Sequence, residues 1–244
     1  MPAVLGGLLV ANALTHADAV GLAATGPLGQ RLGIGIVILL IGLVGGRIIP
    51  SFTLNWLKKR GESSLPARFG VLDRGTLGLV AAALAIWVVL PESLIGGAAL
   101  IAAGVASLGR LARWRGRLTL PEPLVWSLHL GFVWVGLGLL LVGLSPFLSD
   151  VPPAAGLHAL TAGAMGGMTL AVMTRATLGH TGRPLSADRW TVAIYLFVAA
   201  AAGLRVAAPF LADVYLPLLW TSGLAWSTAF GLFVVHYGRM LLSR

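Results

Sequence analysis

Apolar runs of about 20 residues recur along the chain, and short polar turns separate most of them. A helix needs roughly 20 apolar residues to cross a hydrocarbon core about 30 Å thick. The runs predict eight transmembrane helices, at residues 3–24, 28–49, 71–90, 93–111, 124–147, 153–174, 189–209 and 215–240. Only residues 50–70 are long and polar enough to form an extended loop. The sequence therefore predicts an all-α, polytopic transmembrane helix bundle embedded in the lipid bilayer.

The composition excludes a soluble protein of this length. Hydrophobic residues make up 57% of the 244 residues and charged residues only 10%, whereas a soluble domain carries about 25% charged residues. No polar linker divides the spans, so residues 1–244 are predicted to form a single membrane-embedded helical domain. The chain contains no cysteine, which excludes disulfides, iron–sulfur clusters and thiolate metal sites.

Basic residues are concentrated on one side of the predicted bundle. If both chain ends lie in the cytoplasm, fifteen of the seventeen Lys and Arg residues fall on the inner side. The two exceptions are Arg31 and Arg205. Because positive charges near helix ends orient a membrane protein, this distribution predicts a multi-pass chain with both ends inside. The net charge of +9 is accordingly interpreted as an orientation signal, and no nucleic-acid partner is expected.

Three histidines lie deep inside predicted spans, where ionisable side chains are costly and each is a candidate for function, whereas His236 lies close to the inner end of the last span. The three are His16, His129 and His158. At a rise of about 1.5 Å per residue, His16 and His158 lie at similar depths near the outer leaflet, and His129 lies nearer the cytoplasm. One site joining His16 and His158, with His129 at a second position, is therefore expected. Imidazole binds haem iron and copper, although each histidine has the alternative of a hydrogen bond to a neighbouring helix.

The sixth predicted span carries a stripe of polar and sulfur-containing side chains. His158, Thr161, Met165, Met168 and Thr169 follow the spacing that places residues on one helix face. The thioethers of Met165 and Met168 are soft ligands suited to copper(I). Methionine is also an ordinary packing residue, and packing is the preferred interpretation of this pair.

Two segments at inner helix ends, residues 45–57 and 173–185, place arginines beside hydroxyl and turn residues. Because arginine pairs bidentately with carboxylates, Arg47, Arg175 and Arg183 are candidates for binding the propionates of a haem. His180 is expected in the same inside loop as Arg183. The alternative is anchoring by positive charge with capping of the helix ends, which leaves the density of Gly, His, Thr and Pro unexplained.

These segments carry a resemblance to a known family. GGRIIPSFTLNWL at 45–57, LHLGFVWVGLGLLL at 128–141, and the stretch from His158 through MTRATLGHTGRPL resemble the NnrS family of bacterial polytopic membrane proteins. That family is described as containing haem and copper and as linked to nitric-oxide and nitrosative-stress responses. The resemblance implies haem b and copper as cofactors and the bacterial inner membrane as location. It matches His129, His158 and His180 to family positions, and His16 less closely.

One departure from the family pattern affects the expected partners and functions. Family members are typically longer, and their N-terminal part carries a further histidine-rich segment of the type HxHE, which this chain lacks. Exposed small-residue faces then favour a homo-oligomer, and a redox partner is the other expected protein contact.

A cofactor-free transporter and an assembly subunit of a membrane redox complex stay open as alternatives. Acidic residues cluster at the ends of the spans, which disfavours an ion-coupled carrier. Whether the chain is an enzyme is left open.

Overall fold

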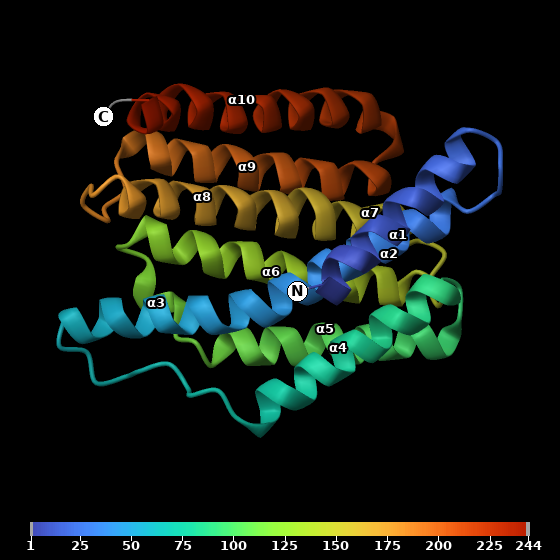
Figure 1. Cartoon of the computed structure of the whole chain (residues 1–244), viewed down its shortest axis with the longest axis horizontal. Helices are drawn as coiled ribbons and strands as arrows, with labels where there is room; N and C mark the ends of the chain where they lie inside the picture. The colour runs from blue at the N-terminus through green and yellow to red at the C-terminus, as the bar shows by residue number, and fades with distance from the viewer. Residues whose placement is uncertain (1, 243–244) are drawn as a thin grey trace.

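The computed structural model describes residues 2–242, which fold into a bundle of long helices without a β-strand (Figure 1). The helices are α1 (Pro2–Ala19), α2 (Gly26–Leu40), α3 (Gly46–Lys59), α4 (Val71–Val89), α5 (Leu94–Ala112), α6 (Pro123–Leu144), α7 (Pro153–His158), α8 (Gly167–His180), α9 (Arg189–Ala207) and α10 (Tyr215–Leu242). Two π-helical segments, η1 (Ile41–Gly45) and η3 (Ala159–Gly166), join α2 to α3 and α7 to α8 without a break. Short 3-10 segments, η2 (Gly116–Thr119), η4 (Ala208–Phe210) and η5 (Ala212–Val214), lie in the turns.

Seven continuous helices within residues 2–242 are long and apolar enough to cross a membrane. They are Gly26–Lys59, Val71–Val89, Leu94–Ala112, Pro123–Leu144, Pro153–His180, Arg189–Phe210 and Ala212–Leu242. The remaining helix, α1, has 18 residues and includes Asn12, His16 and Asp18. The predicted all-helical transmembrane bundle is confirmed. The crossing of the membrane by α1, on which the cytoplasmic placement of the N-terminus depends, stays a prediction.

Two helices extend beyond their predicted ends. The second predicted span does not stop before Pro50 but continues through it to Lys59, so the predicted loop at 50–70 is shortened to residues 60–70. Proline is tolerated inside this helix because the carbonyl that loses its N–H partner, that of Gly46, is bonded by a side chain instead. The sixth predicted span continues to His180. His180 therefore ends a helix and does not lie in a loop.

Helix α6 lies at the centre of the bundle. Leu124, Leu128, Phe132, Val135 and Leu139 are at most 1% exposed, and their spacing of three and four residues forms one helix face. Figure 1 shows α8, α9 and α10 side by side on one flank of α6, with α3, α4 and α5 on the other flank. The segment around His129, which carries the family resemblance, is therefore at the middle of the molecule.

Candidate functional site

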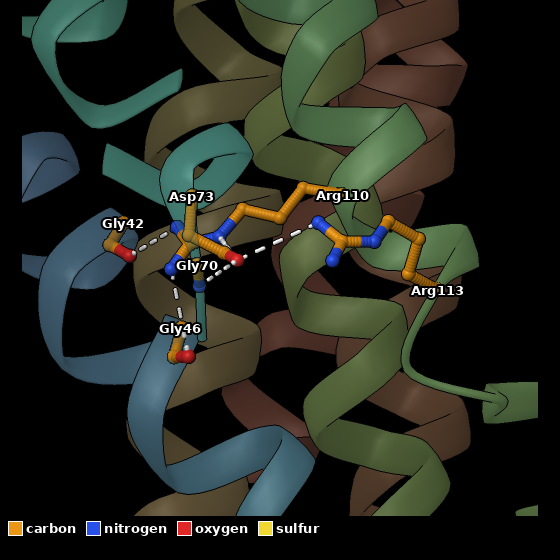
Figure 2. Close-up of polar contacts among 6 residues, drawn as sticks. All are labelled: Gly42, Gly46, Gly70, Asp73, Arg110 and Arg113. Atoms are coloured by element: carbon orange, nitrogen blue, oxygen red, sulfur yellow. Dashed lines mark hydrogen bonds and ion pairs between the residues drawn. The ribbon is translucent and has the colours of Figure 1, made fainter. Parts of the chain in front are cut away.

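Asp73 and Arg110 are the two oppositely charged side chains buried within residues 2–242, and they form an ion pair between α4 and α5 (Figure 2). Arg110 Nε lies 2.7 Å from Asp73 Oδ1, and the side chains are 0% and 4% exposed. Arg113 Nη1 lies 3.5 Å from the other carboxylate oxygen, Oδ2. The same oxygen accepts a hydrogen bond from the backbone N–H of Gly70 at 2.9 Å. Asp73 thus caps the start of α4 while it neutralises a guanidinium from α5.

Arg110 also binds the long helix that runs from α2 to α3. Its Nη1 donates to the carbonyl of Gly42 at 3.0 Å, and Nη2 donates to the carbonyl of Gly46 at 3.5 Å. The Gly46 carbonyl is available because Pro50, four residues later, has no N–H. Glycine at residue 46 leaves room for this contact, because a Cβ atom there would overlap the guanidinium in its present position. Arg110 therefore joins three parts of the bundle at one point, and the arrangement fixes the relative positions of these helices.

His129 is buried and hydrogen-bonded to a neighbouring helix. Its Nε2 lies 2.9 Å from the hydroxyl of Thr53 on α3, and that hydroxyl lies 2.9 Å from the carbonyl of Ile49. A carbonyl only accepts, so the hydroxyl proton goes to Ile49 and His129 Nε2 donates to Thr53. His129 Nδ1 then carries a lone pair that has no hydrogen-bond partner in the described part of the chain. A Cβ atom on Gly116 would lie 2.6 Å from Nδ1, so backbone covers this nitrogen.

His158 lines a cavity of about 560 Å³ between the α7–η3 helix, α9 and α10. Arg205 from α9 and two tryptophans of α10, Trp220 and Trp226, line the same cavity. The His158 ring makes no hydrogen bond to any residue from 2 to 242. An imidazole, a guanidinium and two aromatic rings are groups suited to the iron, a propionate and the macrocycle of a haem. This cavity is the candidate cofactor site that the structure supports best.

His16 lines a different cavity, of about 570 Å³, between α1, α2 and η3. Asn12, Gln30 and Met165 are among its other lining residues. The expected joint site of His16 and His158 is therefore wrong for this structure, because His158 faces α9 and α10 whereas His16 faces α2. Neither histidine belongs to a cluster that resembles a metal centre, since no group of three or more His, Asp, Glu or Cys side chains gathers within residues 2–242.

The predicted stripe on the sixth span is divided between two cavities. His158 and Thr161 line the cavity towards α9 and α10, whereas Met165, Met168 and Thr169 line a groove against α2 and η1. The cause is η3, because the i→i+5 hydrogen bonds of a π-helix turn successive residues less around the axis than an α-helix does. Residues that an α-helical pattern places on one face are therefore separated.

Met168 behaves as a packing residue. It is 6% exposed, and its sulfur lies where a Cβ atom on Gly131 of α6 would approach to 2.8 Å. Its terminal methyl group faces Gly45 on η1. Met165 differs, because it lines the His16 cavity as well as the groove. Met165 is therefore the methionine placed to act with a histidine.

The remaining predicted candidates lie towards the other end of the bundle. Arg47 and Arg183 are exposed, and so is His180. The guanidinium carbon of Arg175 lies 4.0 Å from the ring centroid of Phe52, which links α8 to α3. His180 ends the 28-residue helix whose first turns carry His158, so the two histidines lie roughly 30 Å apart. The structure therefore does not bring Arg47, Arg175 or Arg183 to the His158 cavity, which Arg205 lines instead, and the binding of a propionate by these three arginines stays a prediction.

The comparison with known proteins agrees with the resemblance seen in the sequence. The family described as NnrS protein matches residues 1–244. This chain belongs to the NnrS family. No curated protein and no solved structure matches the NnrS chain. Membership supports a multi-pass membrane protein related to the nitric-oxide response.

Sequence reasoning on this NnrS chain missed the most buried charges and underestimated Arg205. Arg110 counts among the fifteen inner-side basic residues of the sequence, although it lies in the last turn of a strongly apolar helix. A charge in that position has to reach a partner, which was the available signal. Arg205 is one of the two exceptions to the positive-inside distribution, and in the structure it lines the same cavity as His158.

Proposed function

We propose that this NnrS protein binds haem b through His158 and acts in the response to nitric oxide and nitrosative stress. The supporting observation is the cavity that brings the unbonded His158 ring together with Arg205, Trp220 and Trp226. Family membership supports the link to nitric oxide. A haem held there by a single histidine would supply an iron able to bind a small ligand such as nitric oxide.

The residues around the cavity have distinct parts in this proposal. His158 would supply the imidazole that holds the iron of a haem, and Arg205 would pair with a propionate. Gly166 leaves room for the ring of Trp226, since any side chain at 166 would overlap it, and the ring packs on Phe230 at a centroid distance of 4.8 Å. The tryptophans provide apolar surface that excludes water from one side of the macrocycle.

Copper is the second cofactor that we propose, in the separate His16 cavity. The support is the presence of one imidazole and one thioether, from His16 and Met165, on the wall of one cavity. Both are ligand types that suit copper. Asn12 and Gln30 add polar groups beside them.

Absorbance spectra of purified protein test the haem proposal. We expect a Soret band in the wild type, and its loss in His158→Ala. His180→Ala is the matched control because it removes an exposed histidine at the opposite end, and its spectrum should equal that of the wild type. His129→Ala should also keep the band, since His129 is bonded to Thr53.

A wild-type protein without a Soret band, or an unchanged band in His158→Ala, would contradict the haem assignment. Colourless protein that moves a solute across proteoliposomes would support a transporter instead. Colourless protein that co-purifies with a redox complex would support an assembly subunit.

Copper analysis of the wild type and of His16→Ala tests the second site, where the variant should lose the metal.

A further inference from the structure

Arg31 and Arg205, the two exceptions to the basic end of the bundle, each line a large cavity. The Arg205 cavity is the proposed haem site. The Arg31 cavity has a volume of about 600 Å³ and lies between the start of α2, the ends of α4 and α6, and the start of α7. The two cavities share no lining residue. Gln30 and Ile34 also line the His16 cavity, but Arg31 and Glu92 do not, so the charged part of the Arg31 cavity needs an explanation of its own.

The guanidinium of Arg31 is held by the fold at one nitrogen. Nε donates to the carbonyl of Val88 at 3.1 Å. Val88 lies in the last turn of α4, where backbone carbonyls have no partner within the helix. Within residues 2–242, no carboxylate oxygen comes within 4.0 Å of Arg31. The Nη groups are thus oriented, and their charge is left for a ligand.

A carboxylate lines the same cavity at a separate place. Glu92, in the turn between α4 and α5, belongs to the wall but forms no ion pair with Arg31. Most of the remaining wall is apolar, and includes Ile34, Trp87 and Leu157. The cavity therefore offers a cation, a separate anion and apolar surface.

We propose that this cavity binds a phospholipid with a phosphoethanolamine headgroup. Arg31 donates to the phosphate in charge-assisted hydrogen bonds, and Glu92 accepts from the ammonium group. The acyl chains follow the apolar wall formed by Ile34 and Leu157. The position at the helix ends agrees, because headgroups lie there when the spans cross a bilayer. A free phosphate ion would leave Glu92 and the apolar wall without a partner.

Lipid titration of delipidated protein in detergent, followed by native mass spectrometry, tests this inference. We expect phosphatidylethanolamine to bind about tenfold more tightly than phosphatidylglycerol, which has no ammonium group to bond Glu92. Glu92→Gln should abolish this preference, and Arg31→Gln should weaken the binding of both lipids by about tenfold or more. Asp150→Asn is the matched control for Glu92, since it removes an exposed carboxylate at the same end but outside the cavity wall.

The preference between the two lipids decides the outcome. Equal affinities in the wild type, or a preference that survives Glu92→Gln, would overturn the proposal. Inorganic phosphate that displaces the lipid from the wild type at equal concentration would assign a free-anion site instead. Because Glu92 is exposed, Glu92→Gln should fold normally, and so keeps the proposal falsifiable even if Arg31→Gln unfolds.

Discussion

Arg110 shows how a full charge is accommodated inside this bundle. Its guanidinium is completely buried, yet Asp73 neutralises it and two backbone carbonyls accept its remaining hydrogen bonds. Removing one partner from a buried ion pair leaves the other charge without compensation, which costs more than the pair itself contributes. The pair should therefore act as a unit.

Single and double substitutions at this pair test that unit. Arg110→Gln and Asp73→Asn should each lower the free energy of unfolding by about 3–5 kcal/mol. The double variant should lose less than the sum of the two, because neither charge is then left unpaired. Arg113→Gln is the control, since its side chain is 33% exposed and 3.5 Å from the carboxylate, and it should cost under about 1 kcal/mol. If denaturant unfolding gives additive losses of the free energy of unfolding, the two residues contribute independently and this prediction is wrong.

A substitution at Gly46 tests the contact of the Arg110 guanidinium from the helix that accepts its hydrogen bonds. Gly46→Ala should displace the Arg110 guanidinium and lower the unfolding temperature, because the new methyl group overlaps it. Gly75→Ala is the matched control, because a Cβ at that exposed helical position meets nothing within 4 Å. The control should be neutral or slightly stabilising, since alanine favours a helix. Similar melting curves for both variants would show that Arg110 does not need the space at residue 46.

At the scale of elements, the π-helical segments mark what sequence patterns could and could not predict. Apolar runs predicted the helices because lipid imposes one length on every span. The same patterns assumed α-helical spacing on the sixth span, and η3 breaks that assumption between His158 and Met165. Pro50 likewise predicted a helix end, but Arg110 from a distant helix bonds the carbonyl that proline leaves free. In the second case a contact between elements far apart in sequence decided the outcome.

The start of α9 is joined to α10 by a chain of polar contacts. The N–H and the hydroxyl of Thr191 both donate to Asp188 Oδ1 at 2.8 Å. His236 Nε2 lies 2.9 Å from Asp188 Oδ2, and the hydroxyls of Thr191 and Tyr237 are 2.6 Å apart. Asp188, at the start of α9, thus contacts His236 of α10 directly and Tyr237 of α10 through Thr191.

This connection should be sensitive to acid. Burial alone raises the pKa of Asp188, but hydrogen bonds from Thr191 and the charge of His236 outweigh it and hold the pKa below its ordinary value of 3.8. A carboxyl with a lowered folded-state pKa stabilises the fold above about pH 4 and loses that effect as the pH falls further. Asp188→Asn should therefore lower the unfolding temperature at neutral pH, and the difference from the wild type should shrink as the pH falls below 3.8. Asp213→Asn is the control because it removes an exposed carboxylate. A difference in unfolding temperature between Asp188→Asn and the wild type that persists in acid would contradict this prediction.

At the scale of the whole molecule, charge is distributed unequally between the two ends. Figure 1 shows the long connection at 60–70 and the turns before α6 and α9 gathered at one end, with the turns after α4, α6 and α9 at the other. The first group and the helix ends that adjoin it carry most of the basic residues, so the predicted segregation of charge agrees with the arrangement of the helices. Sequence could predict this asymmetry because it depends only on helix order. It could not predict the cavities, which depend on how neighbouring helices are rotated.

Cysteine labelling would fix the orientation of the whole bundle, since the natural chain has no cysteine and single ones can be introduced. A membrane-impermeant maleimide added to spheroplasts should label Ser149→Cys, in the turn after α6. Ser63→Cys and Ser186→Cys, among the basic loops, should react only after the membrane is opened, because basic loops stay in the cytoplasm. Ala3→Cys examines α1 separately, and it should also be protected if this helix is the eighth span. Labelling of Ala3→Cys from outside, with the other three as expected, would show that α1 lies in the outer half of the bilayer beside α2 and does not cross it.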